Sequence, residues 1–349
     1  MTARDSDCAR SSRRAAARRV LLALASLWLV TLASFGLSEL LPGNPGDADG
    51  ARGAFDPAVM AARRARLDLD RPRFWNPSPR GGVLGSLSET RYAGFVGRLV
   101  RLDLGISERD GRPVTEKLGR ALGPTLLLGS AALALAFGLG VPLGLLSARR
   151  EGGALDHAIG LGLFLLAAVP SFWAATLALV FLAGPGAFPM QGLVSAGAAE
   201  LGPVGRALDL LWHLVLPVTC LGYGILVVVA RQMRAAAAAA LASDWFRTLR
   251  AQGLSRRRLT VRLLRNALLP VVTLLGLELP ILVSGSVIVE RVFGIPGLGL
   301  LLAEAVLQRD QPVLLALVTL SALVTWVGLL CADVLSGLAD PRTRLEDPS

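Results

Sequence analysis

The chain alternates between long apolar runs and polar intervals that carry arginine. Six runs are long enough for a helix to cross a hydrocarbon core of roughly 30 Å, which takes about 20 mainly apolar residues. They occupy residues 20–41, 125–148, 155–184, 212–230, 269–289 and 313–335. A helix satisfies its own backbone hydrogen bonds inside a bilayer. The pattern therefore predicts an all-α integral membrane protein, a bundle of six transmembrane helices.

The first run follows an arginine-rich tail, residues 1–19, an arrangement that is also typical of secretory signal peptides. The apolar region of a signal peptide spans about 7 to 15 residues, whereas residues 20–41 are apolar throughout most of their length and no small-x-small cleavage site follows. We therefore expect a retained first transmembrane helix.

The longest polar interval, residues 42–123, holds 14 basic and 10 acidic residues. It predicts an extracytoplasmic region. Within it, Tyr92, Phe95 and Leu99 recur at helical spacing among arginines, which indicates an amphipathic helix resting on the bilayer surface or on neighbouring helices. A scaffold role is favoured over ligand contact. Residues 124–335 would then form a five-helix core, and residues 336–349 a C-terminal tail.

Two runs contain residues that shape a membrane helix. Gly140 and Gly144 give the second run a small-residue face that allows close helix packing. Pro170 and Ser171 interrupt the third run. Because proline has no backbone N–H, we expect a kink and a free carbonyl there, and kinked helices often line pathways.

Residues 243–270 form a polar segment inside the apolar C-terminal half. Its pattern predicts one helix from Asp244 to Gln252, a positive-φ corner at Gly253, and a second helix capped by Ser255. Six consecutive alanines, residues 235–240, lead into it helically, and Pro270 opens the next apolar run. Two short helices suspended between membrane helices are suited to transmit movement.

Composition excludes a soluble protein and nucleic-acid binding. The chain is 53% hydrophobic and 18% charged, with a mean hydropathy of +0.56. The net charge of +10 could suggest a nucleic-acid partner. The basic residues instead lie between the apolar runs, where they indicate topology.

The arginine distribution predicts that both termini of this multi-pass protein are cytoplasmic. With that orientation the inner intervals 1–19, 149–156, 231–268 and 336–349 carry six, two, nine and two basic residues, and the short outer intervals carry one and two. The 14 basic residues of the long outer interval do not conflict, because long loops translocate largely regardless of charge.

No catalytic, cofactor or metal motif is found in the sequence. The only lysine, Lys117, lies outside any phosphate-binding loop, and no metalloprotease, hydrolase or paired-cysteine motif occurs. The three cysteines and two histidines are isolated from one another: Cys8, Cys220, Cys331, His157 and His213. Active transport by this chain would need an energy source supplied by a partner.

Several motifs resemble those of the permease subunits of ATP-driven (ABC) importers, in the branch that takes up dipeptides, oligopeptides and nickel. The sequence RTLRAQGLS, followed by LRNALLPVVT, resembles the cytoplasmic coupling segment of these permeases, and we call residues 243–270 the coupling segment. Other matching stretches are PGNP at 42–45, LDLG at 102–105, GRPV at 111–114, VPSFW at 169–173, FGIPGLG at 293–299, QRD at 308–310 and DPR at 340–342. Residues 74–89 depart from the family pattern.

The resemblance implies the fold of a type I ABC-importer permease and a location in a bacterial cell (inner) membrane. It further implies a second homologous permease, with a heterodimer favoured, two ATP-binding subunits and an extracytoplasmic solute-binding protein. Substrates would be di- or oligopeptides, with nickel chelates as an alternative. The residues that the resemblance places at the ATPase contact are Asp244, Arg247, Ala251, Gly253, Leu254, Asn266 and Pro270.

Acidic residues in apolar runs are candidates for the pathway, because a charge at mid-bilayer costs about 2.5 to 3.5 kcal/mol on insertion scales. Glu278 lies well inside the fifth run, where the resemblance places a neutral polar residue. It either faces the pathway, with Pro170 and Ser171, or is neutral or bonded to another helix. Glu290 and Asp333 lie near run ends, within reach of water or headgroups, and structural roles are expected for them.

Two other classes compete with a permease subunit. A self-sufficient secondary transporter would hold its own ion site and show repeat symmetry, but no second half resembles the first. A membrane enzyme or signalling anchor is disfavoured by the missing catalytic motifs.

Overall fold

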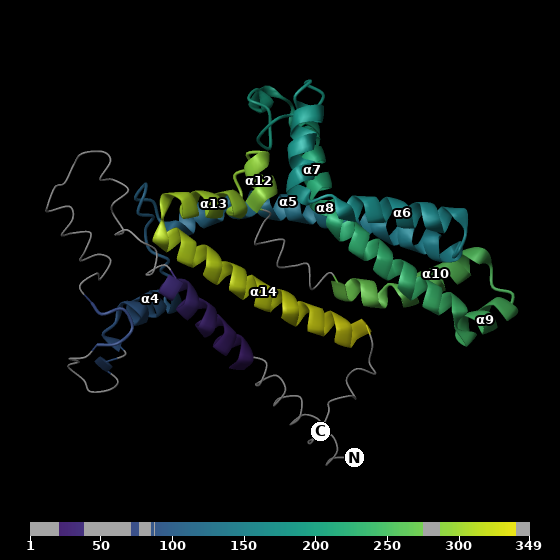
Figure 1. Ribbon diagram of the computed structural model, residues 1–349, viewed down its shortest axis with the longest axis horizontal. Helices are drawn as coiled ribbons and strands as arrows, with labels where there is room; N and C mark the ends of the chain where they lie inside the picture. The colour runs from purple at the N-terminus through teal and green to yellow at the C-terminus, as the bar shows by residue number, and fades with distance from the viewer. Residues whose placement is uncertain (1–20, 38–70, 77–84, 87, 275–286, 340–349) are drawn as a thin grey trace, which may run out of the picture. The chain divides into compact units, whose positions relative to one another are not determined.

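The structure of the chain is a computed structural model that describes residues 21–37, 71–76, 85–86, 88–274 and 287–339 (Figure 1). Across these residues the regular elements are helices, with one isolated β-bridge between Ile106 and Pro113. The chain divides into two compact units. The first comprises Met1–Gly119 and Glu304–Leu323, and the second comprises Arg120–Ala303 and Val324–Ser349.

Three helices of the described part are long and apolar enough to cross a membrane. They are α5 (Val114–Arg149), α8 (Pro203–Ala242) and the stretch Gln311–Leu330 of α14 (Gln311–Ala339). Helix α6 (Ala154–Ala168) and the helical stretch Ser171–Ala183 form a bent pair that counts as a fourth span if taken as one. Length and composition therefore support three or four of the six predicted spans.

The remaining two predicted spans are only partly described. An apolar helix covers Leu21–Leu37 of the first, and residues 275–286 of the fifth lie outside the described residues. The total of six therefore stays a prediction. From the end of the fifth predicted span, α12 (Val287–Val292) is followed by α13 (Leu298–Gln308), which lies before the sixth.

Helix α8 is much longer than the predicted span of residues 212–230. Its 40 residues extend for about 60 Å at a rise of about 1.5 Å per residue, twice the thickness of the hydrocarbon core. Pro203 begins the helix, where a missing N–H is harmless, and the alanine run carries it to Ala242. The two ends of α8 thus form helix outside the apolar stretch.

Helices α5 and α8 approach each other closely in the second unit. A Cβ atom on Gly144 would lie 2.4 Å from the carbonyl oxygen of Ala230 and 2.8 Å from the Cβ of Met233. One on Gly140 would lie 2.9 Å from a methyl carbon of Val229. Val229, Ala230 and Met233 are fully buried. The small-residue face that the sequence predicts is therefore a helix contact.

In the first unit, the predicted amphipathic helix is α4 (Arg91–Val100), which Thr90 caps by accepting a hydrogen bond from the amide of Ala93. Its apolar face meets the helix Leu21–Leu37. The ring of Phe35 lies 5.6 Å from that of Tyr92 and 5.8 Å from that of Phe95, between centroids. Contact with a neighbouring helix, one of the two predicted settings, is thus observed.

A polar cluster in the first unit joins the loop before α5 to the turn between α13 and α14. The ammonium of Lys117 lies 3.1 Å from the carboxylate of Asp110 and 3.7 Å from that of Asp310, and it donates to the hydroxyl of Ser107. Ser107 in turn donates to the buried Asp310. Burial acts to raise the pKa of Asp110, but the polar groups beside it, the Ser107 hydroxyl, the Arg112 amide and the Lys117 ammonium, outweigh burial and leave the pKa below its usual range.

Candidate functional site

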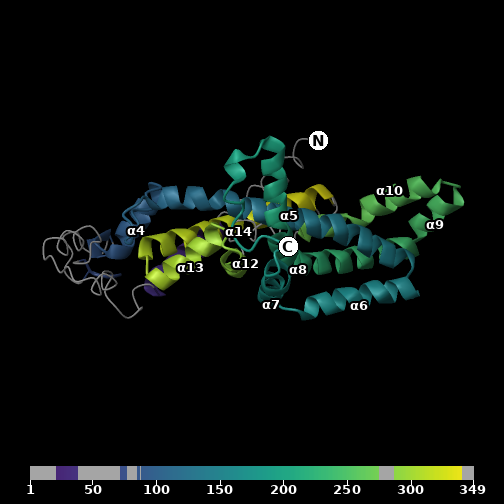
Figure 2. The same cartoon turned by 90° about the horizontal axis from the view of Figure 1, so that it is seen from above.

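The coupling segment has the predicted helix, corner and helix. Helix α8 ends at Ala242 because Ser243 adopts an extended ψ of 151°. Helix α9 (Asp244–Ala251) and helix α10 (Arg256–Ala267) follow, with Gly253 between them at a φ of +71°. Both views show α9 at the end of α8, with α10 turning back from it (Figures 1 and 2).

Helix α9 attaches to the protein by one aromatic side chain and presents polar groups outward. Phe246 is buried, and its ring meets that of Trp245 edge to face. The side chains of Asp244 and Arg247 are 96% and 73% exposed and lie 3.5 Å apart. An ion pair that is so exposed contributes little to stability, so both groups are available to a partner.

A groove of about 770 Å³ lies between α9 and α10. Two arginines, two polar side chains and three largely apolar ones line it, and these are Arg262, Arg265, Thr248, Asn266, Trp245, Leu249 and Leu269. Of the seven residues predicted for the ATPase contact, Asn266 alone lines this groove. Trp245 and Leu249 lie four positions apart and so on one face of α9, and sequence reasoning missed Arg262 and Arg265 as lining residues.

The other predicted contact residues are distributed along the outside of the segment. Ala251 and Gly253 are exposed, whereas Leu254 and Pro270 are half-buried. A Cβ atom on Gly253 would meet nothing of this chain within 4 Å. The corner is therefore open on its own surface, and glycine is needed there for its backbone conformation.

Helix α10 is fixed to the remainder of the second unit. Leu263 and Ala267 are buried, and Ala267 packs in one cluster with Met233 and Ala237 of α8. The guanidinium of Arg149, at the end of α5, donates to the hydroxyl of Thr260 at 2.6 Å. Sequence reasoning missed this last contact, because nothing near either residue indicates the other.

The predicted interruption of the third run is a sharp break. Helix α6 ends at Ala168, α7 (Ser171–Ala178) begins after Pro170, and the two directions differ by 88° (Figure 1). The expectation of a free carbonyl is wrong. The carbonyl of Leu166 accepts from the amide of Val169, and the carbonyl of Val169 accepts from the hydroxyl of Tyr223. Pro170 and Ser171 are themselves exposed.

Glu290 has the structural role expected of it, but water does not reach it. The residue is 0% exposed. Its carboxylate accepts from the hydroxyl of Thr125 at 2.9 Å and from the amide of Leu300 at 3.0 Å. Side-chain oxygens of Thr125 and Glu290 also fill the space beside Gly297, where a Cβ atom would come within 2.5 Å of each. Glu290 thus fixes the glycine-rich turn that precedes α13.

Two further acidic candidates have no described side chain. Glu278 lies outside the described residues, as does the side chain of Asp333. Among the residues that are described, no group of three or more His, Cys, Asp or Glu side chains could hold a metal ion.

The chain matches known transport proteins along most of its length. The family model described as "Binding-protein-dependent transport system inner membrane component" matches residues 140–345. The oligopeptide transport system permease protein AppB of Bacillus subtilis (strain 168) is 33% identical over 332 residues, with 93% of this chain and 97% of AppB covered. The dipeptide transport system permease protein DppB of Escherichia coli (strain K12) is 32% identical over 347 residues, covering 94% and 97%.

Two other similarities agree with these. A putative peptide permease protein of Brucella suis biovar 1 (strain 1330) is 36% identical over 332 residues, covering 94% of this chain and 98% of the relative. The MetNI methionine ABC transporter, solved in inward-facing conformations, has a chain that matches with a TM-score of 0.51 at 16% identity, covering 65% of this chain and 97% of that one, which shows the fold. The chain therefore belongs to the family of binding-protein-dependent transport system inner-membrane components, and it is a permease subunit of an ATP-driven importer of the type I fold.

Proposed function

We propose that this permease forms half of the transmembrane pathway for di- or oligopeptides, with nickel chelates as an alternative cargo. The observation that carries the proposal is the set of relatives named for oligopeptide, dipeptide or peptide transport, each matched over more than nine tenths of both chains. A second homologous permease supplies the other half, and the two chains form a heterodimer. Two ATP-binding subunits and an extracytoplasmic solute-binding protein complete the importer.

The coupling segment is the contact with an ATP-binding subunit. Its support is the exposed helix, corner and helix, which is attached to α8 and α5 through α10 but is open outward at Asp244, Arg247 and Gly253. The nine arginines between residues 231 and 268 suit an acidic docking surface. The contact set is Asp244, Arg247, Ala251, Gly253, Leu254, Asn266 and Pro270.

Transport proceeds by alternating access, with the coupling segment as the lever and the broken span α6–α7 beside the pathway. Pro170 and Ser171 are exposed at the break, where no carbonyl of Leu166 or Val169 is left free. Solute would therefore meet side chains there. Glu278 is included in the proposed pathway on the sequence argument alone.

The association test is purification of the tagged chain from native membranes in mild detergent. We expect an ATPase and a second permease to be recovered with it, and ATP-dependent uptake of labelled peptide by the complex in liposomes with its binding protein. A secondary transporter would instead accumulate peptide when reconstituted alone, driven by a proton or sodium gradient without ATP. That result would overturn the proposal.

We further propose that both termini are cytoplasmic and that residues 42–123 are extracytoplasmic. The arginine distribution supports this orientation. In a variant without native cysteines, Ala196→Cys should react in intact cells with a thiol reagent that does not cross the membrane. Ser255→Cys should react only after permeabilisation, and both positions are exposed in the structure. Labelling of Ser255→Cys in intact cells would reverse the assigned orientation.

A further inference from the structure

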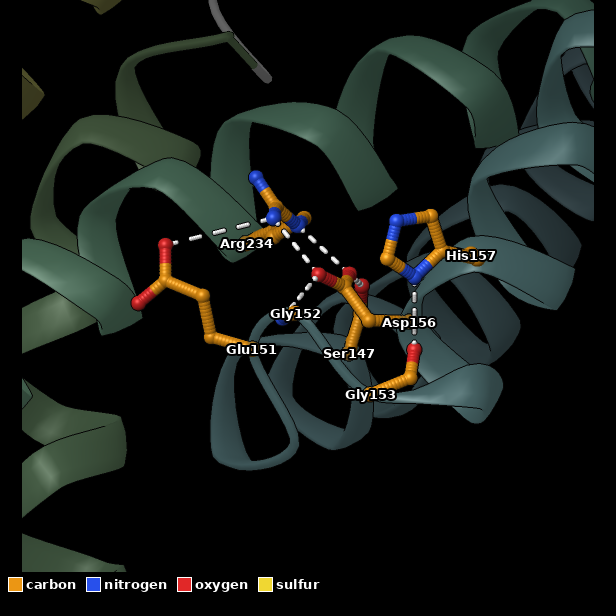
Figure 3. A network of polar contacts seen from close by, with 7 residues as sticks. All are labelled: Ser147, Glu151, Gly152, Gly153, Asp156, His157 and Arg234. Carbon is orange, nitrogen blue, oxygen red and sulfur yellow. Dashed lines mark hydrogen bonds and ion pairs between the residues drawn. The ribbon is translucent and has the colours of Figure 1, made fainter.

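A partly buried ion pair joins the start of α6 to α8 in the second unit. Figure 3 shows Asp156, in the first turn of α6, facing Arg234 of α8, with Ser147 of α5 beside it. Asp156 is 7% exposed. The two partners are 78 positions apart in the sequence, so the pair closes a long-range contact between helices.

The carboxylate of Asp156 is held in one geometry by four donors. The Nε and Nη2 atoms of Arg234 donate to its two oxygens, each at 2.7 Å. The amide of Gly152 donates at 3.0 Å, and the hydroxyl of Ser147 donates to Oδ1. A two-pronged guanidinium contact fixes orientation as well as distance. Helix α6 is therefore attached to α8 by a directional contact.

The turn between α5 and α6 is shaped for this contact. Gly152 has a φ of +74°, which aims its amide at the carboxylate, and Gly153 precedes the first residue of α6. Glu151 lies 3.9 Å from the same guanidinium but is mostly exposed. Elsewhere α6 and α8 share an apolar cluster that includes Leu163 and Val229, and at the end of α6 the hydroxyl of Tyr223 on α8 donates to the carbonyl of Val169. Packed apolar helices can slide by small amounts, whereas the two-pronged contact of Asp156 with Arg234 fixes both distance and direction at the start of α6.

The ion pair connects α8, which leads to the coupling segment, with α6, the first half of the broken span. From Arg234, α8 continues unbroken to Ala242, and α9 begins two residues later. From Asp156, α6 continues unbroken to Ala168, immediately before the break at Pro170. Helices are stiff over such lengths, so a displacement of α9 reaches Arg234, and a displacement of Asp156 reaches the break.

We propose that Asp156 and Arg234 form the joint through which movement of the coupling segment is passed to the broken span α6–α7. They are positioning residues, because they act on α6 and α8 and contact neither solute nor nucleotide. The inference rests on the proposed contact between the coupling segment and an ATPase. Its distinctive consequence is uncoupling: with the joint loosened, ATP hydrolysis continues while the broken span no longer follows it.

The test uses the complete importer in liposomes, with its ATPase, second permease and binding protein, and measures solute taken up per ATP hydrolysed. Asp156→Asn keeps the size of the side chain but removes the charge. We expect uptake per ATP to fall at least about fivefold, the lower end of usual coupling effects, with ATP hydrolysis and subunit recovery retained. Glu151→Gln is the matched control and should stay within about twofold, because an exposed pair contributes little.

Two further variants keep the inference falsifiable if Asp156→Asn assembles poorly. Arg234→Lys preserves the charge but not the two-pronged contact, and it should show an intermediate loss of uptake per ATP. The double variant Asp156→Asn with Arg234→Gln should lose no more uptake per ATP than the more severe of its two single variants. Each single variant already removes the same ion pair.

The outcomes separate the joint from its alternatives. Unchanged uptake per ATP in the assembled Asp156→Asn and Arg234→Lys complexes would overturn the inference. So would a parallel loss of hydrolysis, uptake and abundance in both, because the pair would then only stabilise the fold. If the unaltered chain recovers no ATPase, the proposed function itself fails, and this is seen before any variant is compared.

Discussion

Gly253→Glu is expected to abolish solute uptake and the recovery of the ATPase, while the chain still inserts and folds. Gly253 has a φ of +71°, and a Cβ atom added there would meet no described atom of this chain within 4 Å. The cost within the permease is therefore backbone strain of about 1 to 2 kcal/mol. At the proposed contact, we expect the large loss to come from a side chain that projects from the corner toward the ATP-binding subunit. Co-purification and uptake at matched membrane abundance measure the effect.

Two sets of variants separate strain from crowding at the corner. Asparagine tolerates positive φ better than most other residues with a side chain. The Gly253→Asn variant should therefore lose ATPase recovery if crowding causes the loss, and retain it if backbone strain does. Gly186 has a φ of +85° and open space around it, far along the chain from the coupling segment. Gly186→Glu should recover the ATPase normally. Uptake by Gly253→Glu equal to that of the unaltered protein would exclude the corner as the contact.

Gly144→Ala is expected to destabilise the second unit by about 1 to 3 kcal/mol, the usual range for overpacking. The added Cβ would lie 2.4 Å from the carbonyl of Ala230 and 2.9 Å from the amide nitrogen of Arg234. These are backbone atoms, so the two helices must move apart. Denaturant titration of the purified chain in mixed micelles measures the change in unfolding free energy.

Gly138 provides the matched control on the same helix. A Cβ atom there meets nothing within 4 Å, so Gly138→Ala should be neutral or stabilise by roughly 0.5 to 1 kcal/mol, the helix preference for alanine over glycine. Equal stability of the two alanine variants would mean that α5 and α8 do not pack as described. Because Gly144 also lies against Arg234, its alanine variant should lower uptake per ATP as well.

The features that sequence predicts well are those set by neighbouring residues. The corner of the coupling segment follows from Gly253 and Ser255, and the break in the third run follows from Pro170, since each acts on its own backbone. The resemblance to the permease family likewise rests on short motifs of neighbouring residues. The length of α8 was not predicted, because hydropathy marks the apolar residues 212–230 and does not register Pro203 or the alanine run as helix.

Contacts between distant residues could not be predicted. Asp156 and Arg234 are 78 positions apart, and Glu290 and Thr125 are 165 apart. From the neighbouring sequence alone, each of these polar side chains is expected to be solvent-exposed. For that reason we expected water to reach Glu290. Only the fold brings a hydrogen-bonding partner to it. The same holds at Pro170, where a free carbonyl was expected: the carbonyl of Leu166 accepts from the amide of Val169, and that of Val169 accepts from Tyr223.

The setting of Lys117 limits how this permease can be studied inside a complex. It is the only lysine in the sequence, its side chain is 17% exposed, and its ammonium contacts Asp110, Asp310 and Ser107. Amine-directed cross-linkers therefore have one poorly accessible side-chain target on this subunit. Cross-links to a partner should be sought through carboxylates or introduced cysteines, and a lysine-based map lacking this chain would say nothing about its neighbours.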